Sequence, residues 1–174
     1  MSVVEAHSSQ DMLNFGAVLG RSLEAGDVVV LHGPLGAGKT TLVRGLGEAL
    51  GVEGTIQSPT FVVARAHRRI DSSQPPLVHV DAYRLTHHDE LVDLDLDIDH
   101  SITVIEWGRP YAERLVDEWL DIDIQRPEVD IDEDIDLSEA DSGIRVVTIT
   151  AHTRSGEPTH RFDDVLEAID ASRH

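Results

Sequence analysis

The chain contains no cysteine, which excludes a disulfide framework, a thiolate metal site and a cysteine nucleophile. It also has no apolar run long enough for a membrane-spanning helix, and its first residues lack the basic-then-apolar order of a secretory signal. Its 174 residues are enough for one packed domain without covalent staples. We therefore expect a single cytoplasmic domain over residues 1–174, with no membrane partner.

Positive charge is scarce. Fourteen Lys and Arg residues stand against 33 Asp and Glu residues, a formal net charge of −19. Such a surface repels nucleic-acid phosphates at long range, so we expect no DNA partner and no direct, tight RNA binding. The simplest interpretation of the excess of acidic residues is a soluble or salt-adapted surface. The charge does not exclude a nucleotide, because backbone amides, one lysine and a metal ion act at short range.

One motif dominates the sequence. Residues 33–40 read GPLGAGKT and fit the P-loop pattern G-x-x-x-x-G-K-[ST]. The β-branched run at 28–31 predicts a buried strand before it, and apolar residues at helical spacing predict a helix after it that ends at Gly51. The amides and positive dipole end of a helix start attract an anion. The motif and both flanks therefore predict a nucleotide-binding site.

Each residue type in this loop has a physical role. Glycines permit backbone angles and a close approach that a Cβ would prevent. The ammonium of Lys39 is expected to reach the β- and γ-phosphates, and the hydroxyl of Thr40 to ligate Mg²⁺. The loop residues predicted to bind the nucleotide are Gly33, Leu35, Gly36, Ala37, Gly38, Lys39, Thr40 and Thr41.

Two acidic residues end predicted strands, namely Asp81 after 77–80 and Glu106 after 102–105. A carboxylate at the carboxyl edge of a parallel sheet can hold Mg²⁺ directly or through water. Either residue can be the metal-side acid while the other orients the attacking water. The sequence leaves open which of the two carboxylates has which role.

A connecting loop at 58–61, which we call the switch segment, carries Thr60 and resembles a loop that brings a hydroxyl towards the γ-phosphate. We predict a catalytic role for Thr60 together with Lys39, Asp81 and Glu106. Two histidines near these motifs, His32 and His79, are expected to be packed residues rather than ligands.

Strand and helix patterns alternate along the chain, which predicts an α/β fold. The class that we predict is a three-layer P-loop NTPase-like fold with a mostly parallel central sheet and a C-terminal antiparallel hairpin. Strands are predicted at 28–31, 61–64, 77–80, 102–105, 119–124 and 144–150. Helices are predicted from Ser8 or Ser9 to Leu23 and at 41–50, 88–94, 110–117 and within 159–170. The segment 127–142, with eight acidic residues and no basic one, is expected to be a mobile hairpin loop, and 171–174 a frayed tail.

Four motifs in order resemble those of the TsaE (YjeE-type) family, the bacterial P-loop ATPases of tRNA threonylcarbamoyladenosine biosynthesis. They are residues 33–41 (GPLGAGKTT), 58–61 (SPTF), 79–85 (HVDAYRL) and 104–107 (VIEW), and the similarity covers about residues 8–125. Four ordered motifs are far more specific than a P-loop alone. Two stretches depart from the family pattern: the acidic segment 127–142, and the run 93–99 in place of a glycine-containing link.

The resemblance implies a set of roles and partners. Lys39 and Thr40 would bind phosphate and Mg²⁺, and Thr60 would belong to a nucleotide-sensing loop. Asp81 and Glu106 would serve the metal and hydrolysis, and Trp107 would lie near the nucleotide. The partners implied are the TsaB and TsaD proteins, whose complex modifies adenosine 37 of ANN-decoding tRNA and whose turnover this chain would support. The tRNA would be reached only through that complex.

Three functions are compatible with these features of the sequence. An ATPase switch predicts slow turnover alone, because partners complete the water and charge arrangement for phosphoryl transfer. A small-molecule kinase needs an arginine-bearing lid, and the only arginine cluster is Arg65, Arg68 and Arg69. A GTP-binding regulator normally reads guanine through an Asn-Lys-x-Asp segment, which the sequence does not contain. These observations favour the Mg²⁺-dependent ATPase.

Overall fold

The computed structural model describes residues 1–87, 89–126 and 143–172. These residues form one seven-stranded sheet with the order β1-β7-β6-β2-β5-β4-β3. Its strands are β1 (Ser2–Ala6), β2 (Val28–His32), β3 (Ala64–His67), β4 (Leu77–Asp81), β5 (Ile102–Glu106), β6 (Glu118–Gln125) and β7 (Arg145–Thr153).

The centre of the sheet is parallel. Strands β6, β2, β5 and β4 run in the same direction, whereas β1, β7 and β3 pair antiparallel with their neighbours. This arrangement confirms the α/β class with a mostly parallel centre, and the β6–β7 pair confirms the C-terminal antiparallel hairpin. The short edge strand β1 was not predicted from the sequence, because its pairing partner β7 lies at the other end of the chain.

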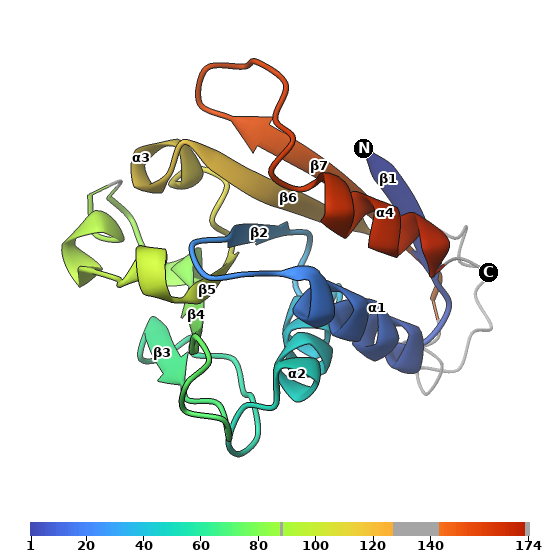
Figure 1. Cartoon of the computed structure of the whole chain (residues 1–174), viewed down its shortest axis with the longest axis horizontal. Coiled ribbons are helices and arrows are strands. Elements are labelled where there is room, and N and C mark those ends of the chain that lie inside the picture. The colour runs from blue at the N-terminus through green and yellow to red at the C-terminus, as the bar shows by residue number, and fades with distance from the viewer. Residues whose placement is uncertain (88, 127–142, 173–174) are drawn as a thin grey trace, which may run out of the picture.

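Helices cover both faces of this sheet (Figure 1). They are α1 (Ser9–Ser22), α2 (Lys39–Leu50), α3 (Ala112–Leu115) and α4 (Asp163–Ala171), with short 3₁₀ helices η1 (Ala82–Arg84), η2 (Val92–Leu94) and η3 (Ile98–His100). Apolar residues of α1, α2 and α4 pack on one face with Leu31, Val104 and Ile149. Residues around α3 pack on the other face with Val30 and Val80. The fold therefore has three layers, as predicted.

Helices α1 and α2 approach each other most closely at Gly16 and Gly45, and this contact fixes the position of the P-loop helix. A Cβ at Gly16 would lie 2.1 Å from the carbonyl oxygen of Leu42. A Cβ at Gly45 would lie 2.0 Å from the carbonyl oxygen of Leu13. Because both obstacles are backbone atoms, any larger residue at either position would push the two helices apart.

The strand predicted at 61–64 is wrong, since β3 begins only at Ala64. The preceding residues form a turn in which the backbone N–H groups of Val62 and Val63 donate to the carbonyl oxygen of Pro59, at 2.9 and 2.7 Å. Val63 has a positive φ of 66°, which no strand residue adopts. The β-branched composition of this run was overridden by a proline-initiated turn that leaves Phe61 exposed.

The predicted helix over 88–94 is also wrong for the described part of that segment, which holds only turns and the 3₁₀ helix η2. Leu91 is buried there, but Val92 and Leu94 remain exposed, so the segment buries too little apolar surface to stabilise a longer helix. The helix predicted at 110–117 is shorter than expected and comprises α3 alone. Among the described residues, no helix has the length and apolar character needed to cross a membrane.

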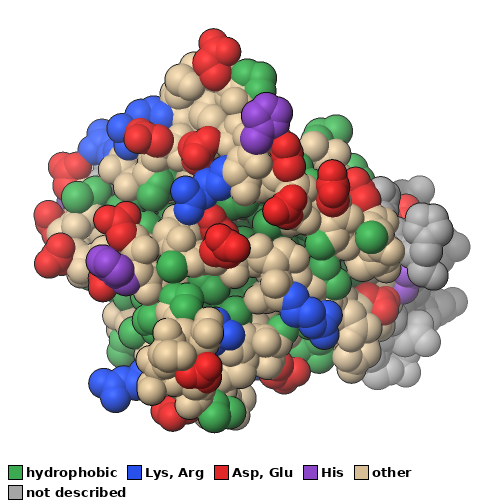
Figure 2. Space-filling view, in the orientation of Figure 1, with side chains coloured by type: hydrophobic (Ala, Val, Ile, Leu, Met, Phe, Trp, Pro, Cys, Tyr) green, Lys and Arg blue, Asp and Glu red, His purple; other side chains and the backbone are tan. Residues whose placement is uncertain are grey.

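The acidic segment 127–142 and residues 173–174 lie outside the described residues, so the expectations for a mobile loop there and for the last two residues stay predictions. On the face drawn in Figure 2, acidic side chains are spread among neutral and hydrophobic ones over much of the surface. This distribution agrees with the excess of Asp and Glu in the sequence.

Candidate nucleotide-binding site

The P-loop connects the carboxyl end of β2 to the start of α2. Gly33 has φ 141°, and a Cβ there would lie 2.4 Å from the carbonyl oxygen of Ile124, so the loop passes close against β6. Gly38 adopts the left-handed conformation as the N-cap of α2 and offers no side-chain cap. The amides of the first helical turn are therefore left without a capping side chain, as an anion-binding helix start requires.

Lys39 is buried beneath this loop. Its Nζ donates to the carbonyl oxygens of Gly33, at 2.8 Å, and Pro34, at 2.9 Å. Burial lowers the pKa of Lys39, and the charges of Glu106 and Asp81 oppose that shift. Lys39 is the only lysine in the sequence. The chain thus has a single ammonium side chain, and it lies in the P-loop.

The two predicted acids are neighbours across the sheet, because the register of parallel strands β4 and β5 pairs Asp81 with Glu106. Both carboxylates are buried, at 4 % and 3 % exposure. Glu106 Oε1 accepts a hydrogen bond from Thr40 Oγ1 at 2.9 Å. It also lies 2.9 Å from His79 Nε2. Glu106 is therefore the acid that contacts the P-loop hydroxyl.

Asp81 has a different set of partners, which lie in the switch segment and in η1. Its Oδ2 accepts from Thr60 Oγ1 at 2.6 Å and from Ser58 Oγ at 3.0 Å. Its Oδ1 accepts from the backbone N–H of Tyr83 at 3.0 Å. The two acids therefore have different neighbours, because Glu106 contacts the P-loop and Asp81 contacts the switch segment.

Trp107 follows Glu106 in the left-handed conformation, with φ 62°. For a bulky residue this is an outlier that the surrounding structure must hold. Its backbone N–H donates to the carbonyl oxygen of Leu31 at 2.8 Å. The ring lies 5.3 Å from that of Tyr83 and 5.9 Å, edge-on, from that of His32, measured between centroids. His32 is thus packed against Trp107.

These side chains surround a cleft of about 400 Å³ at the carboxyl edge of the sheet. Of the predicted site residues, only Gly33 is missing from its lining. The lining residues are Leu35, Gly36, Ala37, Gly38, Lys39, Thr40, Thr41, Ser58, Thr60, Asp81, Tyr83, Glu106 and Trp107. Among the described residues, no arginine lines this cleft, so the Arg65, Arg68 and Arg69 cluster does not form a lid over it.

Comparison with known proteins assigns the family. The model of the family described as "Threonylcarbamoyl adenosine biosynthesis protein TsaE" matches residues 6–134. The chain belongs to the TsaE family. It is 49 % identical over 125 residues to the Mycobacterium tuberculosis protein named tRNA threonylcarbamoyladenosine biosynthesis protein TsaE, covering 67 % of this chain and 74 % of that protein. It is 53 % identical over 118 residues to the Streptomyces coelicolor protein of the same name, covering 66 % of this chain and 79 % of that protein.

The fold agrees with this family. The crystal structure of Bacillus subtilis YdiB superposes with a TM-score of 0.70 over 99 % of this chain and 96 % of that one, at 22 % sequence identity. The TsaE family functions in tRNA threonylcarbamoyladenosine biosynthesis, so this chain is placed in that process by its family. The resemblance based on four sequence motifs is therefore confirmed.

Two arginines of this TsaE-family chain hydrogen-bond to carbonyl oxygens of the P-loop and were not predicted from the sequence. Arg126 Nη2 donates to the carbonyl oxygen of Gly36 at 2.6 Å. Arg145 Nε donates to the carbonyl oxygen of Ala37 at 3.0 Å, although its side chain is almost fully buried. Both residues lie far from the loop in sequence, one directly after β6 and the other at the start of β7. No local motif marks them.

The residues at the cleft fit a magnesium ion that arrives with a nucleotide. Hydroxyl and carboxylate oxygens are the ligands that Mg²⁺ prefers. In the part of the chain that the structure describes, no group of three or more His, Cys, Asp or Glu side chains could hold a metal ion by itself. Mg²⁺ usually takes one or two carboxylates and completes its shell with substrate phosphates and water. Thr40 and Glu106 supply this kind of incomplete ligand set.

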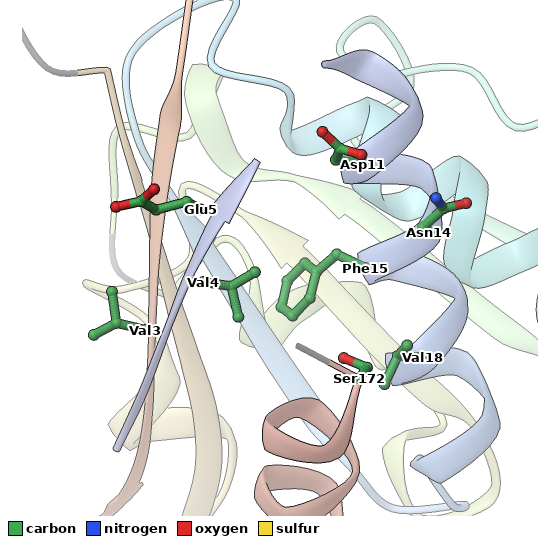
Figure 3. A pocket seen from close by; sticks show the side chains of 8 residues that line it. All are labelled: Val3, Val4, Glu5, Asp11, Asn14, Phe15, Val18 and Ser172. Atoms are coloured by element: carbon green, nitrogen blue, oxygen red, sulfur yellow. The ribbon is translucent and has the colours of Figure 1, made fainter. Parts of the chain in front are cut away.

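A second groove of about 510 Å³ lies between β1, α1 and the end of α4 (Figure 3). Its lining combines apolar side chains with two acids and contains no lysine or arginine in the described residues: Val3, Val4, Glu5, Asp11, Asn14, Phe15, Val18 and Ser172. A phosphate group would meet negative charge there without a compensating cation. The P-loop cleft is therefore the better site for a nucleotide.

Proposed function

We propose that this TsaE-family chain binds and hydrolyses ATP with Mg²⁺. We further propose that it acts on the TsaB–TsaD complex to support its turnover in the threonylcarbamoylation of adenosine 37 in ANN-decoding tRNAs. The observation that carries the first proposal is the meeting of Lys39, Thr40 and Glu106 at one cleft, with Thr40 Oγ1 bonded to Glu106. The second proposal rests on the family.

The residues divide the chemistry between them. Lys39 and the loop amides would bind the phosphate oxygens, and the deep position of the ammonium makes this contact strong because water is excluded. Mg²⁺, held by Thr40 and Glu106, would neutralise charge on the phosphates. Asp81, with Thr60 bonded to it, would orient the attacking water. Trp107 would cover the ammonium from the other side.

Slow turnover by the isolated chain is part of this proposal. Phosphoryl transfer is normally accelerated by an arginine that stabilises charge in the transition state. No arginine lines the cleft among the described residues, so a partner would have to supply or position one. The acidic surface also supports indirect access to tRNA, since it repels a polyphosphate backbone.

Phosphate release from ATP, measured with Mg²⁺ and no added acceptor, tests the enzyme proposal. We expect slow release that rises when TsaB and TsaD are added, and tRNA modification by TsaB and TsaD that depends on this chain and ATP. Glu106→Gln should lower turnover by about 100-fold or more, whereas the exposed Glu167→Gln on α4 should not. Lys39→Ala should weaken ATP binding by roughly 10- to 100-fold, the value of one buried charged hydrogen bond.

Wild-type activity in Lys39→Ala or Glu106→Gln would contradict the site. A strict need for a small-molecule acceptor would favour the kinase instead. Base preference can be followed through the change in tryptophan emission during titration with ATP and GTP. Trp107→Phe, which leaves only Trp119, is the control that should remove this change. Tighter binding of GTP would contradict the assignment to ATP.

A further inference from the structure

His79 lies inside β4, two residues before Asp81, and is fully buried. Residues two apart on a strand share one face of the sheet, so the His79 side chain points to the same side as Asp81. In the neighbouring strand β5, Glu106 occupies the register position opposite Asp81. The imidazole is thereby brought beneath the carboxylate, with 2.9 Å between His79 Nε2 and Glu106 Oε1.

We propose that His79 is a positioning residue that fixes the orientation of the Glu106 carboxylate, an inference that rests on the proposed function. An ionised carboxylate only accepts hydrogen bonds, so the hydrogen of this bond is on Nε2. Thr40 Oγ1 donates to the same oxygen from the P-loop side. Two donors from different elements therefore fix Oε1 of Glu106. Neither bond uses Oε2, which is thereby oriented for the cation.

A purely structural role would predict a different pattern of contacts. A histidine kept only to fill the core would gain most if both of its ring nitrogens were satisfied. Among the described residues, His79 Nδ1 is buried and has no hydrogen-bond partner. An apolar side chain would avoid the cost of burying that nitrogen. The hydrogen bond to Glu106 is the contact that offsets this cost and that an apolar residue cannot make.

Two substitutions separate the donated bond from the packing. His79→Gln keeps a donor at the same distance from the backbone, because the Gln Nε2 can occupy the position of the His Nε2. His79→Leu keeps apolar volume without a donor. We expect calorimetry with a non-hydrolysable ATP analogue to show a Mg²⁺ affinity about 10- to 100-fold weaker in His79→Leu, as for other residues that orient metal ligands. In His79→Gln the Mg²⁺ affinity should stay within about threefold, and Mg²⁺-free nucleotide binding should be unchanged in both.

Equal Mg²⁺ affinity in His79→Leu and the unaltered chain would overturn the inference, and so would an equal loss in His79→Gln and His79→Leu. Circular dichroism and thermal melting establish that the variants are folded. If His79→Leu does not fold, His79→Asn serves in its place, because its shorter amide does not reach Glu106.

A second measurement needs no ligand. In the free, unaltered chain, long-range ¹H–¹⁵N spectra should show the hydrogen of His79 on Nε2, and a hydrogen on Nδ1 alone would overturn the inference. The two proposals fail in different ways. If the unaltered chain does not bind Mg²⁺ with ATP, the proposed function fails and the role of His79 fails with it. If it binds normally and His79→Leu has no effect, only the role of His79 fails.

Discussion

Lys39 Nζ lies 4.0 Å from the centroid of the Trp107 ring. The ammonium therefore has an aromatic face on one side and the carbonyl oxygens of Gly33 and Pro34 as hydrogen-bond acceptors. A cation so close to an aromatic ring gains roughly 0.5–2 kcal/mol, more when water is excluded. The positive φ of Trp107 is what brings the indole to this position, so backbone strain at one residue supports the placement of the only lysine.

The single lysine makes its titration directly measurable. In protein labelled with ¹³C-lysine, one side-chain resonance should titrate with a pKa below the ordinary 10.5, because burial disfavours the charged form. Glu106→Gln should lower this pKa further, since the Glu106 charge raises it. Glu167→Gln, remote from the loop, should leave it unchanged. A pKa at or above 10.5 would contradict the burial of the ammonium.

The lowered pKa of Lys39 also makes the free energy of unfolding depend on pH in a definite direction. As pH rises towards 10.5, the folded chain releases the Lys39 proton before the unfolded chain does. Since the unfolded state then binds more protons, this residue makes the free energy of unfolding increase with pH in that window. Lys39→Met should remove the contribution, which denaturation midpoints at two alkaline pH values would detect.

Asp81→Asn should uncouple the switch segment from the sheet. An amide can accept on only one of its two atoms, so the bonds from Ser58 and Thr60 to one oxygen and from Tyr83 to the other cannot all persist. We expect turnover to fall by about 100-fold or more while ATP affinity changes by less than about tenfold. Faster hydrogen exchange over residues 58–62 should accompany this loss.

Asp71→Asn is a matched control, because exposed Asp71 also accepts from a serine hydroxyl, that of Ser73 at 2.6 Å, but lies away from the cleft. Its turnover should equal that of the unaltered chain. Full turnover in Asp81→Asn would remove Asp81 from the hydrolytic machinery.

Gly16→Ala or Gly45→Ala should destabilise the fold, because each new Cβ would meet a backbone carbonyl oxygen at about 2 Å. The helices must then separate, which costs about 1–3 kcal/mol of unfolding free energy, as for other overpacked sites. Urea denaturation measures this loss. Asn14→Ala, exposed on the same helix as Gly16, should change stability by less than about 0.5 kcal/mol, and a similar value for Gly16→Ala would refute the close α1–α2 contact.

Acid should destabilise the chain through His67. Burial, together with the charges of His79 and Arg65, lowers the pKa of His67 below the ordinary 6.5. As pH falls below 6.5, the unfolded chain therefore takes up this proton before the folded chain, and stability decreases. A pKa difference of one corresponds to about 1.4 kcal/mol.

His67→Asn should accordingly lose less stability between pH 7.5 and 5 than the unaltered chain does. The comparison uses urea midpoints at the two pH values. His87→Asn, at an exposed position, should show the pH dependence of the unaltered chain. An unchanged pH dependence in His67→Asn would exclude His67 as a source of acid sensitivity.

Local sequence chemistry determined the elements whose signals are contained within a few residues. The run 28–31 and the glycines around Lys39 specify a strand, a phosphate loop and a helix start. The residue types in each of these segments suit the backbone conformation that the segment adopts. The helix stop at Gly51 follows from its left-handed conformation, which glycine adopts without cost. The sequence alone therefore predicts these features and the family motifs.

Tertiary structure alone decided which of these pieces meet. The pairing of Asp81 with Glu106 is a property of strand register. Thr40 bonds to Glu106 and Thr60 bonds to Asp81 because of where the P-loop and the switch segment cross the edge of the sheet. Arg145 reaches Ala37 across 108 positions of sequence, and β1 forms only because β7 presents an open edge to it. Such contacts depend on long-range packing, whose energy no local pattern encodes.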